Sequence, residues 1–110
     1  MNLPQDAVIA PEKLNGYLLV WKPADDKSKF LAKAEYVLEN WSQLEADLRS
    51  QILPLEAVPI VETNTFGDRY SIRGNLVGPN GVNLAIVTIW MTEFETGATK
   101  FITLFPDRRD

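Results

Sequence analysis

The sequence contains neither cysteine nor histidine. Without cysteine, the chain has no disulfide and no thiolate nucleophile. Without histidine, it lacks the side chain that most often serves as general base, metal ligand and pH switch. A zinc site would have to be built from carboxylates alone, which is rare for this metal. We therefore expect no metal and no cofactor, and binding is favoured over catalysis.

The balance of charge is acidic, with 11 basic and 15 acidic residues and a net charge of −4. This disfavours nucleic acid and anionic membranes as partners, although a local basic face is still compatible with it. No apolar run reaches the ~18 residues that a membrane-spanning helix needs, and the first ten residues lack the basic region of a signal peptide. We expect a soluble cytoplasmic protein that forms one domain over residues 1–110.

The strongest structural signal is a hairpin whose turn is the Gly-Pro-Asn-Gly of residues 78–81. Pro79 presets φ at the first central position, and Asn80 tolerates a positive φ at the second. Residues 69–77 alternate between apolar and polar side chains, which is typical of a half-buried strand. Residues 82–91 are apolar at both parities. This predicts a central strand covered on both faces, or on one face with a partner on the other.

Two helical segments precede the hairpin. Asp25 or Asp26 is expected to cap the first helix. Asn40 is expected to cap the second, with Gln43 at the spacing of a capping box and Pro54 ending the helix. Their apolar residues recur every three or four positions: Phe30, Leu31, Ala34 and Val37 in the first helix, and Trp41, Leu44, Leu48 and Ile52 in the second.

Short apolar runs account for the rest of the chain. Residues 57–63 contain Pro59, which indicates an edge strand, and residues 98–105 form the last strand. Residues 17–21 favour a strand over a helix, and residues 7–9 are either an additional N-terminal strand or an apolar plug. The sequence therefore predicts an α+β fold, in which two N-terminal helices pack on one face of a four-stranded antiparallel meander sheet.

The most suggestive polar group is Arg69, Ser71 and Arg73, which share one strand face. The guanidinium fork suits phosphate, and an indole can stack on a base. As exposed strand residues, the arginines would instead pair with Glu62, Glu93 or Glu95, and Trp90 would be part of the core. The candidate catalytic residues are Lys29, Arg69 and Arg73, and the candidate binding residues on the sheet face are Ser71, Thr88, Trp90 and Thr103.

Several segments also resemble a known family. They are residues 3–7, 13–19, 27–31, 38–41, 87–90 and 103–106. Together they resemble a small bacterial family, common in cyanobacteria, that is known as a domain of unknown function. The resemblance covers nearly the whole chain and implies no activity.

A second resemblance is to the barnase–EndoU–colicin–RelE group of ribonuclease toxins. It rests on the order of helices and strands and on Trp90 with Thr103-Leu104-Phe105-Pro106. It implies RNA cleavage by lysine, arginine and tyrosine, which points to Lys29, Arg69, Tyr70 and Arg73. The absence of histidine and the acidic charge fit such an activity poorly.

Two hypotheses follow. The preferred one is a non-catalytic protein-interaction or oligomerisation module, whose partner is a second copy of the chain or another protein. The alternative is a ribonuclease-like or nucleotide-binding domain that uses the arginines of the sheet face.

Overall fold

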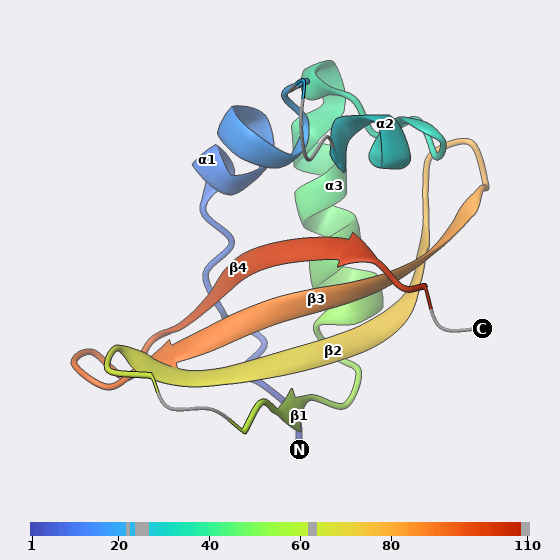
Figure 1. The fold of residues 1–110 in the computed structure, drawn as a ribbon. Coiled ribbons are helices and arrows are strands. Elements are labelled where there is room, and N and C mark those ends of the chain that lie inside the picture. The colour runs from blue at the N-terminus through green and yellow to red at the C-terminus, as the bar shows by residue number, and fades with distance from the viewer. Residues whose placement is uncertain (22, 24–26, 62–63, 109–110) are drawn as a thin grey trace.

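The chain forms two layers, with the helices on one side of an antiparallel sheet (Figure 1). The computed structural model describes residues 1–21, 23, 27–61 and 64–108. The helical elements are α1 (Pro11–Lys13), the π-helical turn η1 (Leu14–Leu18), α2 (Lys27–Ala32), the 3-10 turn η2 (Leu38–Asn40), α3 (Trp41–Asp47) and the π-helical turn η3 (Leu48–Ile52). The strands are β1 (Val58–Pro59), β2 (Gly67–Val77), β3 (Asn83–Glu93) and β4 (Thr99–Pro106).

The sheet has the predicted meander topology. Its strand order is β1-β2-β3-β4, and every neighbouring pair is antiparallel. The predicted hairpin joins β2 to β3, and its turn is closed by a hydrogen bond of 2.9 Å from Gly81 N–H to Gly78 O. The residue of the turn with a positive φ, of 84°, is Gly81. The prediction that Asn80 adopts the positive φ is therefore wrong. Instead, the Asn80 side chain accepts the Val82 N–H at 3.0 Å.

The two outer strands differ in how well the sequence predicts them. β1 is an edge strand, as Pro59 indicates, but only two of its residues pair with β2. In β4 the register shifts: Thr103 lies opposite Ile89, and Phe101 lies opposite Trp90. One extra β4 residue at this bulge interrupts the alternation of side chains along β4, so that Phe101 and Leu104 are both buried.

The second predicted helix is observed as α3 with η3, and it ends before Pro54. Its predicted apolar stripe is confirmed, because Leu44, Leu48 and Ile52 are fully buried. The predicted capping box is wrong. Asn40 Oδ1 accepts the Val37 N–H at 2.8 Å and its Nδ2 donates to Glu35 O at 2.8 Å, so this side chain closes the preceding turn. The expected caps of the first helix, Asp25 and Asp26, lie outside the described residues.

The strand predicted at residues 17–21 is wrong, because the chain continues from α1 through the π-helical turn η1. Leu14 and Leu18 lie four residues apart and are both buried. A helical turn therefore buries the apolar side chains of this short segment as well as a strand would. Of the two alternatives for residues 7–9, the strand is reduced to one parallel bridge between Val8 and Lys100, and the apolar plug is observed as the buried Ala7 and Ile9.

A buried tyrosine connects the hairpin to the helical layer. Tyr36 is fully buried, and its Oη lies 2.5 Å from Asp47 Oδ2 on α3 and 3.1 Å from Val77 O at the end of β2. Burial, and then the hydrogen bond to Asp47, raise the pKa of Tyr36 well above its ordinary value. At Gly78, a Cβ atom would approach Ala34 O to 2.2 Å, so the turn is pressed against the segment that follows α2.

Candidate functional site

The strand register assigns the candidate residues to two different faces of the sheet. We call the face that the helices cover the inner face. It includes Gly74, where a Cβ atom would meet the side chains of Ile52 and Leu55, and its paired residue Ile86, which is fully buried. The opposite face, which we call the outer face, includes Arg69, Ser71 and Arg73 of β2.

Thr88 and Trp90 lie on the inner face, so their expected position beside the arginines is wrong. They pair with Ile72 and Tyr70, and both are fully buried. The Trp90 indole Nε1 donates to Thr88 Oγ1 at 2.7 Å, and Thr88 Oγ1 donates to Ile72 O at 3.0 Å. Trp90 also packs edge-on against Phe101, with ring centroids 5.3 Å apart. This arrangement satisfies the buried polar atoms of a core, and it leaves the Trp90 indole inaccessible for stacking on a base.

Lys29 is separated from the arginines, whereas the register places Thr103 opposite Ile89, on the face of Ser71 and one strand away from β2. Lys29 is exposed on α2, in the helical layer. Thr103 Oγ1 accepts a hydrogen bond of 3.1 Å from Lys27 Nζ, which also donates to Tyr17 Oη at 2.9 Å. The lysine that contacts the sheet is therefore Lys27, and it connects α2 and η1 to the edge strand β4.

The outer face places Arg69, Ser71 and Arg73 opposite an apolar row on β3. Their paired residues are Met91, Ile89 and Val87, in that order. Val87 is buried, whereas Ile89 and Met91 are half-buried. β4 adds Phe105, which lies opposite Val87 and is 39% exposed. The outer face thus carries an apolar band beside the polar and basic strand β2. The band consists of Val87, Ile89 and Met91 of β3 and Phe105 of β4.

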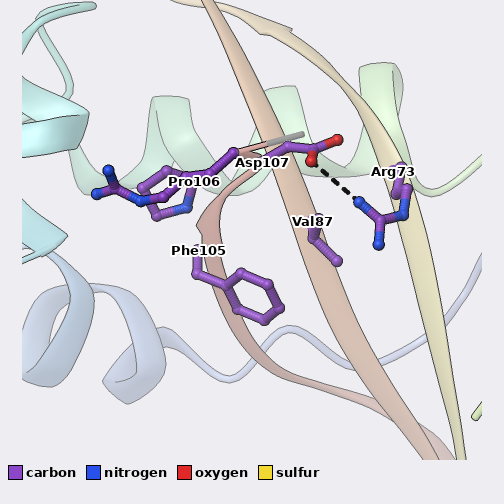
Figure 2. Close-up of a pocket in the computed structure, with 6 residues that line it drawn as sticks. Arg73, Val87, Phe105, Pro106 and Asp107 are labelled. Carbon is purple, nitrogen blue, oxygen red and sulfur yellow. Dashed lines mark hydrogen bonds and ion pairs between the residues drawn. The ribbon is translucent and has the colours of Figure 1, made fainter. Parts of the chain in front are cut away.

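Where the band meets the basic strand, the surface is hollowed. Figure 2 shows Arg73 and Asp107 reaching toward each other, with Val87 and Phe105 beside them. The hollow has a volume of about 400 Å³ and is lined by Arg73, Val87, Phe105, Pro106, Asp107 and Arg108. Arg73 Nη1 donates to Asp107 Oδ1 at 3.0 Å, and 47% of the Arg73 side chain remains exposed. The hollow thus combines apolar walls with an oriented guanidinium.

The ion pair of Arg73 differs from the one that the sequence predicts. Arg73 pairs with Asp107, and Glu93 pairs with Lys100 at 3.2 Å. The hydrogen bond from Lys100, followed by the one from Thr96, lowers the pKa of Glu93. Glu62, another expected partner of the arginines, lies outside the described residues. Among the residues that are described, no three acidic side chains gather as metal ligands would.

The described helices are too short and too polar to cross a membrane. The family model for a domain of unknown function, DUF6883, matches residues 2–108. The chain belongs to the DUF6883 family. The predicted membership of a domain of unknown function is thereby confirmed. No curated protein and no solved structure shows significant similarity to the chain.

Sequence reasoning missed three residues that shape the hollow of this DUF6883 domain: Val87, Phe105 and Asp107. Asp107 looks like part of a charged tail, because it follows Pro106 after the last strand. Its N–H nevertheless donates to Ala85 O at 2.9 Å, which continues the β3–β4 ladder by one residue. The parity of β3 is a signal that finds Val87, since odd-numbered residues of β2 and β3 share a face once the turn fixes the register.

Proposed function

We propose that this DUF6883 domain is a non-catalytic protein-interaction module, acting in the cytoplasm as the sequence predicts, that binds through the outer face of its sheet. The observation that carries the proposal is that the helices cover only the inner face (Figure 1). The outer face presents half-buried Ile89 and Met91 together with exposed Phe105. Apolar side chains in the centre of a sheet face, beside arginines, form the composition of many protein–protein interfaces.

The size of the outer face is compatible with this role. The strands span about 3.3 Å per residue and lie about 4.8 Å apart, so the face measures on the order of 500 Å². A contact that covers it would bury on the order of 1,000 Å² over both partners, which is at the lower end of specific interfaces. We therefore expect a weak or transient complex rather than an obligate one.

The positions of the candidate residues favour binding over the ribonuclease-like or nucleotide-binding alternative. A phosphoryl site needs its cations and its proton-transfer groups within a few ångströms of the reacting atoms. Lys29 is in the helical layer, whereas Arg69 and Arg73 are on the outer face of the sheet. Thr88 and Trp90 are buried on the inner face.

Site-specific photo-crosslinking tests the proposal. A benzophenone side chain is placed at Ile89, in the apolar band, and in a control chain at Val61, which is 99% exposed but lies outside the band. Both chains are expressed in the cells that naturally make the protein and are irradiated. We expect a protein adduct of defined mass from position 89 that position 61 does not give. Equal labelling from both positions contradicts the proposal.

A further inference from the structure

One end of the sheet carries two exposed phenylalanines on adjoining loops. Phe66 is 73% exposed and Phe94 is 62% exposed. The two residues are joined by a hydrogen bond of 3.0 Å from Phe94 N–H to Phe66 O. We call these two residues, with Asp68, Glu93 and Glu95, the aromatic tip. Exposed aromatic side chains held at fixed positions are a common form of interface anchor.

The loop that carries Phe94 is held in one conformation by its own hydrogen bonds. Gly97 N–H donates to Glu93 O at 2.9 Å, Thr96 Oγ1 donates to Glu93 Oε1 at 3.0 Å, and Ala98 N–H donates to Thr96 Oγ1 at 3.1 Å. Gly97 has a φ of 73°, which a left-handed turn requires. A loop that is ordered before it binds loses little conformational entropy on binding.

The aromatic tip and the hollow are complementary in charge and in chemistry. The tip offers a phenyl ring between two glutamates, and its three acids with Lys100 and Arg69, which both lie opposite Met91, carry a net charge of −1. The hollow offers Phe105, Val87 and Pro106 for a ring, and its two arginines with Asp107 carry a net charge of +1. Its volume of about 400 Å³ accommodates an aromatic side chain.

The two surfaces cannot meet within one chain. Glu93 and Val87 belong to the same strand, β3, and lie six residues apart. At ~3.3 Å per residue this separation is about 20 Å, and a paired central strand cannot fold back on itself. Any contact between tip and hollow must therefore join two molecules.

We infer that the hollow of one copy binds the Phe94 loop of a second copy, with Phe94 against Phe105 and Val87 and with Glu95 beside Arg73 and Arg108. This inference rests on the proposed function, because it names a second copy as the partner of the outer face. The contact is heterologous, since each copy contributes a different surface, so further copies can add to the free ends. One loop in one hollow buries less than a standard interface, so the association is weak and weakens further with salt.

Sedimentation velocity on the purified chain tests this inference. We expect the sedimentation coefficient of the wild type to rise with concentration at low salt. The tip variant Phe94→Ser and the hollow variant Phe105→Ser should each associate at least about tenfold more weakly. Trp21→Ser is the matched control, because Trp21 is 60% exposed and lies outside both surfaces. Arg73→Gln is a second hollow variant, which separates the role of charge from that of apolar contact.

Mixing the two variants gives the decisive result. Phe94→Ser keeps its hollow and Phe105→Ser keeps its tip, so an equimolar mixture should form a 1:1 dimer that grows no further. Failure of the mixture to associate, or a wild type that stays monomeric, overturns the inference. A wild type that associates equally well with and without Phe94 also overturns it. In each of these cases an adduct specific to position 89 would still support the proposed function, so the two failures are distinguishable.

Discussion

Ile86 and Ile89 lie three residues apart on β3 and face opposite sides of the sheet. Ile86 is fully buried under the helical layer, whereas Ile89 is half-buried on the outer face. On the inner side of the sheet, the buried polar atoms of Trp90, Thr88 and Tyr36 are hydrogen-bonded. On the outer face, partly exposed charged side chains such as Arg73 lie beside the apolar band. The two faces of the same strands therefore differ: the inner face forms the core, and the outer face leaves apolar and charged side chains partly exposed.

Removing the largest inner side chain should have the largest effect. We expect Trp90→Ala to lower the free energy of unfolding by about 3–5 kcal/mol, because it leaves a cavity beside Phe101 and removes the donor to Thr88. Urea denaturation measures this. The control Trp21→Ala, at an exposed position, should change stability by less than about 0.5 kcal/mol. Similar losses for both variants would mean that the inner face is not the core.

The tyrosine that joins the two layers should give a pH-dependent effect. We expect Tyr36→Phe to cost about 1–3 kcal/mol at neutral pH, because Asp47 Oδ2 loses the hydroxyl that donates to it, whereas Val77 O still accepts from Gln51 Nε2. The pKa of Tyr36 is raised in the folded state. Its contribution is therefore complete below the unfolded pKa of about 10, and it falls by about 1.4 kcal/mol per pH unit above it.

Urea denaturation of both proteins between neutral and strongly alkaline pH measures this difference. The gap in stability between the wild type and Tyr36→Phe should narrow as the pH rises past about 10. Other ionisations are common to both proteins and cancel in the comparison. A gap that stays constant across the alkaline range would show that Tyr36 does not resist ionisation in the folded state.

The outer face should tolerate the loss of its ion pair. We expect Arg73→Gln to lower the free energy of unfolding by less than about 1 kcal/mol, because half-exposed ion pairs contribute little to stability. A double-mutant cycle with Asp107→Asn isolates the coupling between the two side chains. A coupling of about 3 kcal/mol or more would assign this pair to the core rather than to a binding surface.

Much of the fold could be predicted from the sequence, because its signals are local. The turn at residues 78–81 fixes the register of β2 and β3, and Leu44, Leu48 and Ile52 define the buried side of α3. Two kinds of feature could not be predicted. The apolar run at residues 17–21 is too short to separate a strand from a helical turn. The bulge of β4 depends on tertiary packing, since Phe101 and Leu104 both reach the inner face.

The candidate site was predictable in part. The alternation on β2 correctly groups Arg69, Ser71 and Arg73 on one face. The prediction that Thr88 and Trp90 lie beside them is wrong, because the even-numbered residues of β3 pair with Ile72 and Tyr70 on the other face. Asp107 could not be placed beside Arg73 from the sequence, because this ion pair bridges residues 34 apart and crosses the intervening strand. Side-chain pairs of this kind depend on how far β4 extends.

The most direct test of the account is the same substitution on both faces of one strand, with stability measured by urea denaturation. Ile86→Thr places a hydroxyl in the buried inner face, and Ile89→Thr places it on the outer face. We predict that Ile86→Thr costs at least about 2 kcal/mol more than Ile89→Thr, which should stay within about 1 kcal/mol of the wild type. Equal and large losses at the two positions would contradict the claim that the outer face is left open for a partner.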